Sequence, residues 1–229
     1  MTKAVVLLSG GQDSTTSLFL ARALYDEVHA VSVHYGQRHE AELDAARRVG
    51  QMAGVATHVF LELGILSVLG GSALVDGGAL TADGGHADSE APNGLPSSFV
   101  PARNVFLLTA AAAVAVKHGA RDVVTGVCQT DFSGYPDCRR SFVDALEVAL
   151  TAALPSSCGP LRISTPLMWM TKAETVHLAR RLPGCWEALA HTVTCYEGSR
   201  PGCGTCAACV LRARGFAEAG FPDPAHVPA

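Results

Sequence analysis

Short apolar runs alternate with longer amphipathic segments along most of the chain. The apolar runs predict buried strands, and the segments between them, with apolar residues at helical spacing, predict helices. Strands are expected at residues 4–8, 28–35, 57–63, 122–127 and 161–167, and helices at residues 15–24, 40–52, 105–118 and 141–154, with one more helix opening at Thr171. This alternation predicts an α/β fold with a doubly wound, mainly parallel five-stranded sheet.

Two stretches interrupt the alternation. Residues 64–98 are rich in Gly, Ala, Ser and Asp with little periodicity. A loop of that length in a compact domain is usually functional or mobile, so we interpret it as a flexible excursion that could act as a lid. From Leu182 on, the chain is rich in Cys, Gly and Pro. We therefore expect an α/β domain at residues 1–182 and a small C-terminal segment at residues 183–229.

The turn after the first strand carries the strongest pattern for ligand binding. It reads Ser9-Gly10-Gly11-Gln12-Asp13-Ser14. Adjacent glycines let backbone N–H groups approach a ligand, and the N–H groups and dipole of a helix N-terminus favour an anion. The turn lacks the Lys of a P-loop and the pattern of a dinucleotide site. It predicts a phosphate or pyrophosphate cradle formed by Leu8, Ser9, Gly10, Gly11, Gln12, Asp13, Ser14 and Thr15.

Four of the eight cysteines crowd the C-terminal end, at Cys195, Cys203, Cys206 and Cys209. Four thiolates at this spacing suit tetrahedral zinc, and Gly202 and Gly204 permit the tight turn that aims the sulfurs at one point. Reduced core thiols and an iron–sulfur cluster are the alternatives. Because a four-cysteine site has no open coordination position, we expect one structural Zn²⁺ per chain and a zinc-binding C-terminal segment.

Further polar residues are expected on the rim where the parallel strands end. Asp131, Tyr135, Asp137 and Arg139 follow the fourth strand and suit a polar planar heterocycle, with an ordinary solvated loop as the alternative. Arg103 could meet a carboxylate or phosphate bidentately, and an ordinary helix start is equally plausible there. Lys172 stands in a first helical turn, where its charge opposes the dipole. That position suggests a phosphate-holding role as readily as a plain surface lysine.

Composition limits the classes of protein. A chain of 229 residues suits one α/β domain with a small appendage. No apolar run reaches the ~18 residues that span a bilayer, and the start does not have the pattern of a signal peptide, so a cytoplasmic location without disulfides is expected. The net charge is −4 and the 17 Lys and Arg residues are scattered. This favours small-molecule substrates over a nucleic-acid or membrane partner.

The glycine turn resembles the S-G-G-x-D-S loop of the ATP-pyrophosphatase (PP-loop) family, which has an adenine nucleotide alpha hydrolase-like fold and adenylates an oxygen of its substrate. Other stretches, in the same order and spacing, resemble the 7-cyano-7-deazaguanine synthase family. They are Tyr35-Gly36-Gln37-Arg38-His39, Val100-Pro101-Ala102-Arg103-Asn104, Ser133-Gly134-Tyr135-Pro136-Asp137-Cys138-Arg139, Thr165-Pro166-Leu167 with Lys172 and Glu174, and Thr194-Cys195-Tyr196 with the cysteines that follow.

This resemblance implies a ligase that uses ATP and Mg²⁺ to convert 7-carboxy-7-deazaguanine and ammonia to 7-cyano-7-deazaguanine, a queuosine precursor, through an adenylated acid and an adenylated amide. It implies catalytic roles for Asp13, Arg38 and Lys172 around the departing pyrophosphate. The Asp131–Arg139 loop and Arg103 would contact the substrate, and a homodimer is expected. The alternatives are another PP-loop adenylating ligase, acting on tRNA or on a protein carboxyl terminus, and a zinc-knuckle binding module without ATP affinity.

Overall fold

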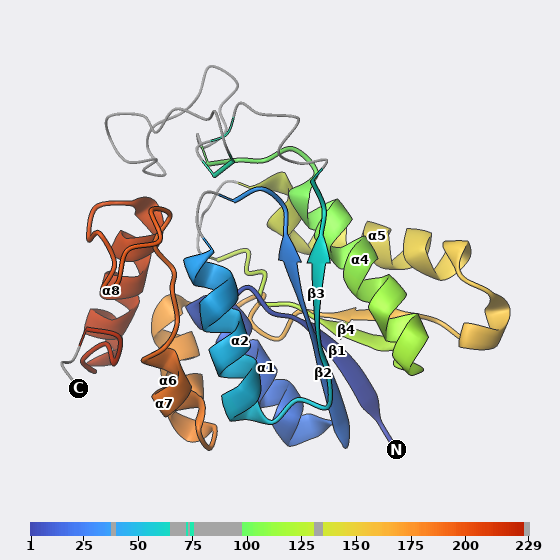
Figure 1. Ribbon diagram of the computed structural model, residues 1–229, viewed down its shortest axis with the longest axis horizontal. Helices are drawn as coiled ribbons and strands as arrows, with labels where there is room; N and C mark the ends of the chain where they lie inside the picture. The colour runs from blue at the N-terminus through green and yellow to red at the C-terminus, as the bar shows by residue number, and fades with distance from the viewer. Residues whose placement is uncertain (38–39, 65–71, 73, 76–97, 131–134, 227–229) are drawn as a thin grey trace.

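The protein forms a five-stranded parallel sheet covered by helices on both faces (Figure 1). The computed structural model describes residues 1–37, 40–64, 72, 74–75, 98–130 and 135–226. The strands are β1 (Lys3–Leu7), β2 (Glu27–His34), β3 (His58–Glu62), β4 (Asp122–Val124) and β5 (Arg162–Ser164). Their order is β3-β2-β1-β4-β5, and all pairs are parallel. The doubly wound sheet predicted from the hydrophobic pattern is confirmed.

The helices divide between the two faces of the sheet. They are α1 (Gln12–Leu24), α2 (Ala41–Ala53), α4 (Arg103–His118), α5 (Arg140–Ala153), α6 (Lys172–Arg181), α7 (Cys185–Leu189) and α8 (Ala207–Ala219), with the short 3-10 helices η1 (Pro136–Cys138) and η2 (Ser156–Cys158). Helices α4 and α5 cover one face, and α1 and α2 cover the other, with α6, α7 and α8 beyond them (Figure 1). Among the helices of the described residues, none has the length and apolar character needed to cross a bilayer.

Strand β1 lies at the centre of the core and is buried on both sides. Ala4 and Val6 belong to the core cluster that contains Leu18 of α1, whereas Val5 belongs to the cluster that contains Leu108 of α4. Successive residues of a strand point to opposite faces, so a strand covered by helices on both faces is apolar throughout. This explains why the first strand has no polar alternation.

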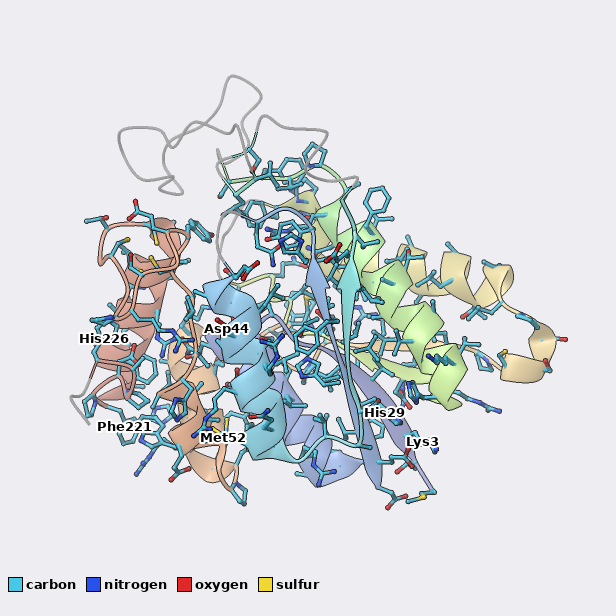
Figure 2. All side chains as sticks on the ribbon, viewed as in Figure 1. Lys3, His29, Asp44, Met52, Phe221 and His226 are labelled. Atoms are coloured by element: carbon cyan, nitrogen blue, oxygen red, sulfur yellow. The ribbon has the colours of Figure 1, made fainter. Side chains whose placement is uncertain are left out.

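The C-terminal segment shares the core of the α/β domain. Leu189 of α7 and Phe216 of α8 lie in the same core cluster as Leu18. Phe221, labelled in Figure 2, meets the Trp186 ring edge-on with centroids 5.7 Å apart. The sequence pattern predicts no helix beyond Leu182, so α7 and α8 are found only in the structure. The boundary at residue 182 stays a prediction.

Most of residues 64–98 lies outside the described residues, and so does the lid interpretation. Of its described residues, Gly64 is exposed, whereas Ser72, Leu74, Val75 and Ser98 are buried. Val75 forms an antiparallel bridge with Gln37, and Leu74 and Val75 pack with Val100. These residues lie next to Tyr35, at the carboxyl end of β2. The part of the excursion around Val75 therefore packs against the rim where ligands bind in this class of fold.

Candidate active site

A cavity of about 320 Å³ opens beside the carboxyl ends of β1 and β4. The strand order reverses between these two strands, and doubly wound sheets bind ligands at such a point. Its walls include Leu8, Ser9, Gly11, Gln12, Asp13, Ser14, Tyr35, Glu42, Arg103, Tyr135, Lys172, Thr194, Tyr196 and Arg212. The glycine turn and the Tyr135 region, predicted to share a rim, thus line one cavity.

The glycine turn is held in a tight conformation by its neighbours. Gly10 has φ +85°, and a Cβ built on it would lie 2.3 Å from the backbone oxygen of Glu42, so only glycine fits. The Ser14 hydroxyl accepts from the Ser9 backbone N–H at 3.2 Å and lies 3.0 Å from the Ser9 hydroxyl oxygen. Gly11 is the N-cap of α1 and has no side chain to cap the first turn. The first-turn N–H groups therefore suit an anion.

Two of the three predicted catalytic residues meet in the cavity. Lys172 Nζ lies 2.5 Å from Asp13 Oδ2. The other carboxylate oxygen of Asp13 is buried and has no hydrogen-bond partner within the described part of the chain. Lys172 begins α6 after the N-cap Thr171, and the predicted capping box with Glu174 is present. Arg38, the third predicted catalytic residue, lies outside the described residues.

Aromatic rings and one cation form the other end of the cavity. The Arg103 guanidinium lies 5.6 Å from the Tyr135 ring centroid and 5.9 Å from that of Tyr35. Ala102, just before it, has φ +58°, a strained conformation that turns the chain into α4. Burial acts to lower the pKa of Arg103, but its neighbours together outweigh burial and the pKa is raised; they are Tyr35, Tyr135, Cys138 and Asp137. Arg103 therefore stays charged.

The other predicted substrate residues do not line the described cavity. Asp137 is buried, and its Oδ2 accepts the backbone N–H of Asn104 at 3.0 Å. Arg139 is exposed at the N-cap of α5. Asp131 lies outside the described residues. Substrate contacts of these three residues stay predictions.

Some cavity residues were not singled out from the sequence. Glu42, on α2, is one: burial raises its pKa to about 7, although Arg103 acts in the opposite direction. Its position could have indicated a role, because Glu42 lies in the first turn of the helix that follows β2, and the carboxyl end of β2 is on the rim. Thr194 and Tyr196 flank Cys195 in a stretch that carries the family resemblance, but no role is assigned to them from the sequence. Arg212 was missed because α8 was missed.

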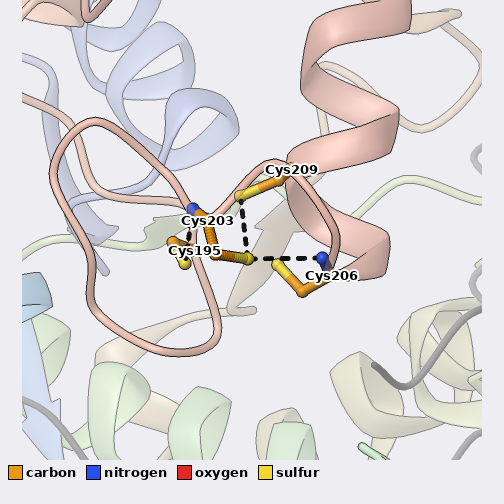
Figure 3. A group of neighbouring side chains, drawn as sticks. All are labelled: Cys195, Cys203, Cys206 and Cys209. Carbon is orange, nitrogen blue, oxygen red and sulfur yellow. Dashed lines mark hydrogen bonds between the residues drawn. The ribbon is translucent and has the colours of Figure 1, made fainter. Parts of the chain in front are cut away.

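The four C-terminal cysteines converge on one point, as Figure 3 shows. Their sulfur atoms all lie within 4.8 Å of one another, and the cluster could hold a metal ion. Backbone N–H groups donate to the sulfurs, from Cys206 to Cys203 at 3.3 Å and from Cys203 to Cys195 at 3.4 Å. Burial acts to raise the pKa of Cys203, but hydrogen bonds from Thr205 and the backbone outweigh it and lower the pKa to about 6. Such a set fits tetrahedral thiolate coordination.

The sheet order and the cavity at its switch point define a doubly wound α/β protein with its candidate ligand site between β1 and β4. Two solved structures share this fold. One, from Methanocaldococcus jannaschii, is titled a predicted subunit of tRNA methyltransferase; it has a TM-score of 0.50 and 20% identity, covering 79% of this chain and 75% of that one. The other, a 4-thiouridine synthetase–RNA complex with bound ATP, has a TM-score of 0.53 and 15% identity, covering 94% of this chain and 53% of that one.

The chain belongs to the family of the queuosine biosynthesis protein QueC, whose family model matches residues 3–220. Curated relatives named 7-cyano-7-deazaguanine synthase agree. The one from Laribacter hongkongensis is 52% identical over 96% of this chain and 93% of its own length, and that from Chromobacterium violaceum 51% over 97% and 92%. A third, from Gloeobacter violaceus, is 51% identical over 98% and 95%. These names do not favour the alternative of another PP-loop ligase.

Proposed function

We propose that this protein converts 7-carboxy-7-deazaguanine and ammonia to 7-cyano-7-deazaguanine at the expense of ATP. The observation that carries the proposal is that one cavity joins the glycine turn at Ser9–Ser14 to the Arg103 and Tyr135 end. A phosphate-binding turn beside a surface for a planar heterocycle is what adenylation of a substituent on that heterocycle requires. Membership of the QueC family supports the same activity.

The chemistry explains why one cavity serves two activation steps. A carboxylate is a poor acyl donor because its leaving group would be oxide. Transfer of AMP from ATP to a carboxylate oxygen releases pyrophosphate and gives a mixed anhydride. Ammonia attacks its carbonyl carbon, AMP departs, and the loss of a proton leaves the amide. A second ATP adenylates the amide oxygen, and loss of AMP and protons gives the nitrile. Both activations occur at an oxygen on the same substituent, so the same groups act twice.

The glycine turn binds the phosphates in this proposal. Its N–H groups and the hydroxyls of Ser9 and Ser14 hold the triphosphate, and Lys172 stabilises the charge that develops on the departing pyrophosphate. The unpartnered, buried Oδ1 of Asp13 suits a hard cation, and a Mg²⁺ bound there would supply further positive charge. Arg38 adds positive charge from the neighbouring rim, which remains a prediction from the sequence.

The opposite end of the cavity holds the deazaguanine. Tyr135 offers a ring face for stacking, and Arg103 offers a guanidinium that pairs with the carboxylate to be activated. Asp131, Asp137 and Arg139 complete the predicted set of substrate residues. Because the reacting carboxylate is an anion, a permanently charged Arg103 suits it better than a titrating group does.

The C-terminal cysteines bind one structural Zn²⁺, and the protein acts as a cytoplasmic homodimer on small molecules without a nucleic-acid partner. Four sulfurs within 4.8 Å of one another support metal binding. Because four thiolates leave no open coordination position, the role of this metal is structural and not catalytic. Metal analysis of the purified protein and its molar mass in solution check these two points separately.

The test of the activity is incubation with 7-carboxy-7-deazaguanine, ATP and isotopically labelled ammonia, followed by mass spectrometry. The expected product is the nitrile carrying the label. Ser14→Ala removes the hydroxyl that bridges the turn and should cut turnover about tenfold. Ser157→Ala, at an exposed position in η2, is the matched control. ATP consumption without labelled product, or turnover in Ser14→Ala equal to the control, would count against the proposal.

A further inference from the structure

Arg212, on α8, lies at the centre of a buried polar network. It is 4% exposed, and its Nε and Nη2 donate to the two carboxylate oxygens of Asp223 at 2.6 and 2.8 Å. Its Nη1 donates to the hydroxyls of Thr192 at 2.7 Å and Thr194 at 2.9 Å, and Nη2 also reaches the Leu189 backbone oxygen at 3.3 Å. An arginine has five N–H donors, and each has an acceptor here.

The segment that Arg212 holds lies against the glycine turn. Val193, between the two threonines, donates its backbone N–H to the Gly10 oxygen at 3.0 Å. A Cβ built on Gly11 would lie 3.7 Å from the Val193 oxygen, so the two backbones run in van der Waals contact. Glycines have no side chains to fix their own conformation. The Val193 hydrogen bond therefore constrains the orientation of the turn.

We propose that Arg212 is a positioning residue for the phosphate-binding turn, acting through Thr192, Thr194 and the Val193–Gly10 hydrogen bond. Although Arg212 borders the cavity, its donors are all engaged by the protein, so it supports the turn and leaves ligand binding to other groups. This proposal rests on the proposed function, because it takes ATP to be the ligand of the glycine turn and the deazaguanine to be the ligand of the other end.

The planar guanidinium lets Arg212 do more than form an ion pair, because it binds Asp223 and the two threonines at the same time. Nε and Nη2 together satisfy Asp223, which neutralises the buried carboxylate. The remaining nitrogen, Nη1, points to the threonines and thereby links α8 to the loop before Cys195. A lysine could neutralise Asp223 but has no planar fork to hold both groups. Helix α8 begins immediately after Cys206, one of the four clustered cysteines. The hydrogen bonds of Arg212 therefore also connect the cysteine cluster to the ATP end of the cavity.

Two variants test the proposal. Thr192→Val removes one acceptor of Nη1 and keeps the shape of a buried side chain that is absent from the described cavity wall. Arg212→Lys keeps the charge beside Asp223 and loses the fork. Both should raise the KM for ATP about tenfold, which corresponds to about 1.4 kcal/mol. The KM for 7-carboxy-7-deazaguanine and the bound zinc should stay within about twofold of the wild type, because neither substitution replaces a residue of the Arg103 and Tyr135 end.

Arg214→Ala provides the matched control. Arg214 is on the same helix, pairs with Glu218 at 3.3 Å and is exposed, so its loss removes an arginine and an ion pair without reaching the loop. Wild-type KM for ATP in Thr192→Val, or equal rises in the KM values of both substrates, would overturn the positioning role. If Arg212→Lys does not fold, Thr192→Val decides alone. A wild-type protein that forms no labelled nitrile would instead overturn the proposed function.

Discussion

The two ends of the cavity are built from different materials. The phosphate end comes from one continuous stretch, Ser9–Ser14, and offers backbone groups and hydroxyls. The opposite end gathers Tyr35, Arg103 and Tyr135 from separate parts of the chain and offers ring faces and a charge. A triphosphate is bound well by backbone N–H groups, whereas a heterocycle needs a shaped surface of side chains. Replacing a side chain at the second end should therefore change the binding of the deazaguanine without changing the binding of ATP.

Lys172 is the exception at the phosphate end, since its role depends on a side-chain charge, and its replacement should have the largest effect. Lys172→Met leaves Asp13 without its cation and removes one of the positive charges proposed beside the departing pyrophosphate. We expect kcat/KM for ATP to fall about 100-fold, a loss of about 2.7 kcal/mol of transition-state stabilisation. Steady-state kinetics measure it. Lys117→Met, at an exposed position on α4, is the control. A loss below about threefold would mean that the Lys172 charge does not stabilise the leaving group.

Arg103→Met tests the opposite end. It keeps much of the apolar stem between the two tyrosine rings and removes the charge. We expect the KM for 7-carboxy-7-deazaguanine to rise about 30-fold, in the range for a charged hydrogen-bonded contact, while the dissociation constant for ATP stays within about twofold. Equilibrium ATP binding and steady-state kinetics separate the two. A comparable loss of ATP affinity would show that the two ends are not independent.

How far the sequence predicts the site depends on the same contrast. The glycine turn could be predicted because covalent adjacency fixes its geometry once a strand precedes it and a helix follows it. The polar loop could not, because polarity does not give direction. Tyr135 lines the cavity, Asp137 turns inward to Asn104, and Arg139 is exposed. Only tertiary contacts sort these residues. Helix α8 was hidden because the Gly, Pro and Cys content before it resembled irregular structure.

Asp137→Asn tests that sorting directly. Its carboxylate accepts the Asn104 N–H, so the substitution removes the charge that strengthens this hydrogen bond at the start of α4. We expect the free energy of unfolding to fall by about 1.5 kcal/mol with little change in the KM for the deazaguanine. Chemical denaturation and kinetics on the same preparation measure both. A large rise in that KM at unchanged stability would instead establish Asp137 as the substrate contact predicted from the sequence.

Glu42 joins the two ends, and its titration should give the smallest effect. Its backbone oxygen packs under Gly10, while its carboxyl interacts with Arg103 and Tyr35. Burial raises the pKa of Glu42 from 4.5 to about 7. The folded state therefore binds this proton more tightly than the unfolded chain does. The resulting stability is present below about pH 4.5 and is lost as the pH rises through about 7.

Glu42→Gln removes the titration and keeps the shape of the side chain. The full shift would correspond to roughly 3 kcal/mol, but Glu42 is only partly buried, so we expect about 1 kcal/mol. The variant should lose less unfolding free energy than the wild type between about pH 5 and about pH 8, because a neutral amide has no proton to release. Denaturant titrations at the two pH values measure the difference. An equal loss of unfolding free energy in the two proteins would mean that Arg103 already compensates the ionised Glu42 carboxylate. The charge of Arg103 would then act across the cavity on the residue that packs under the glycine turn.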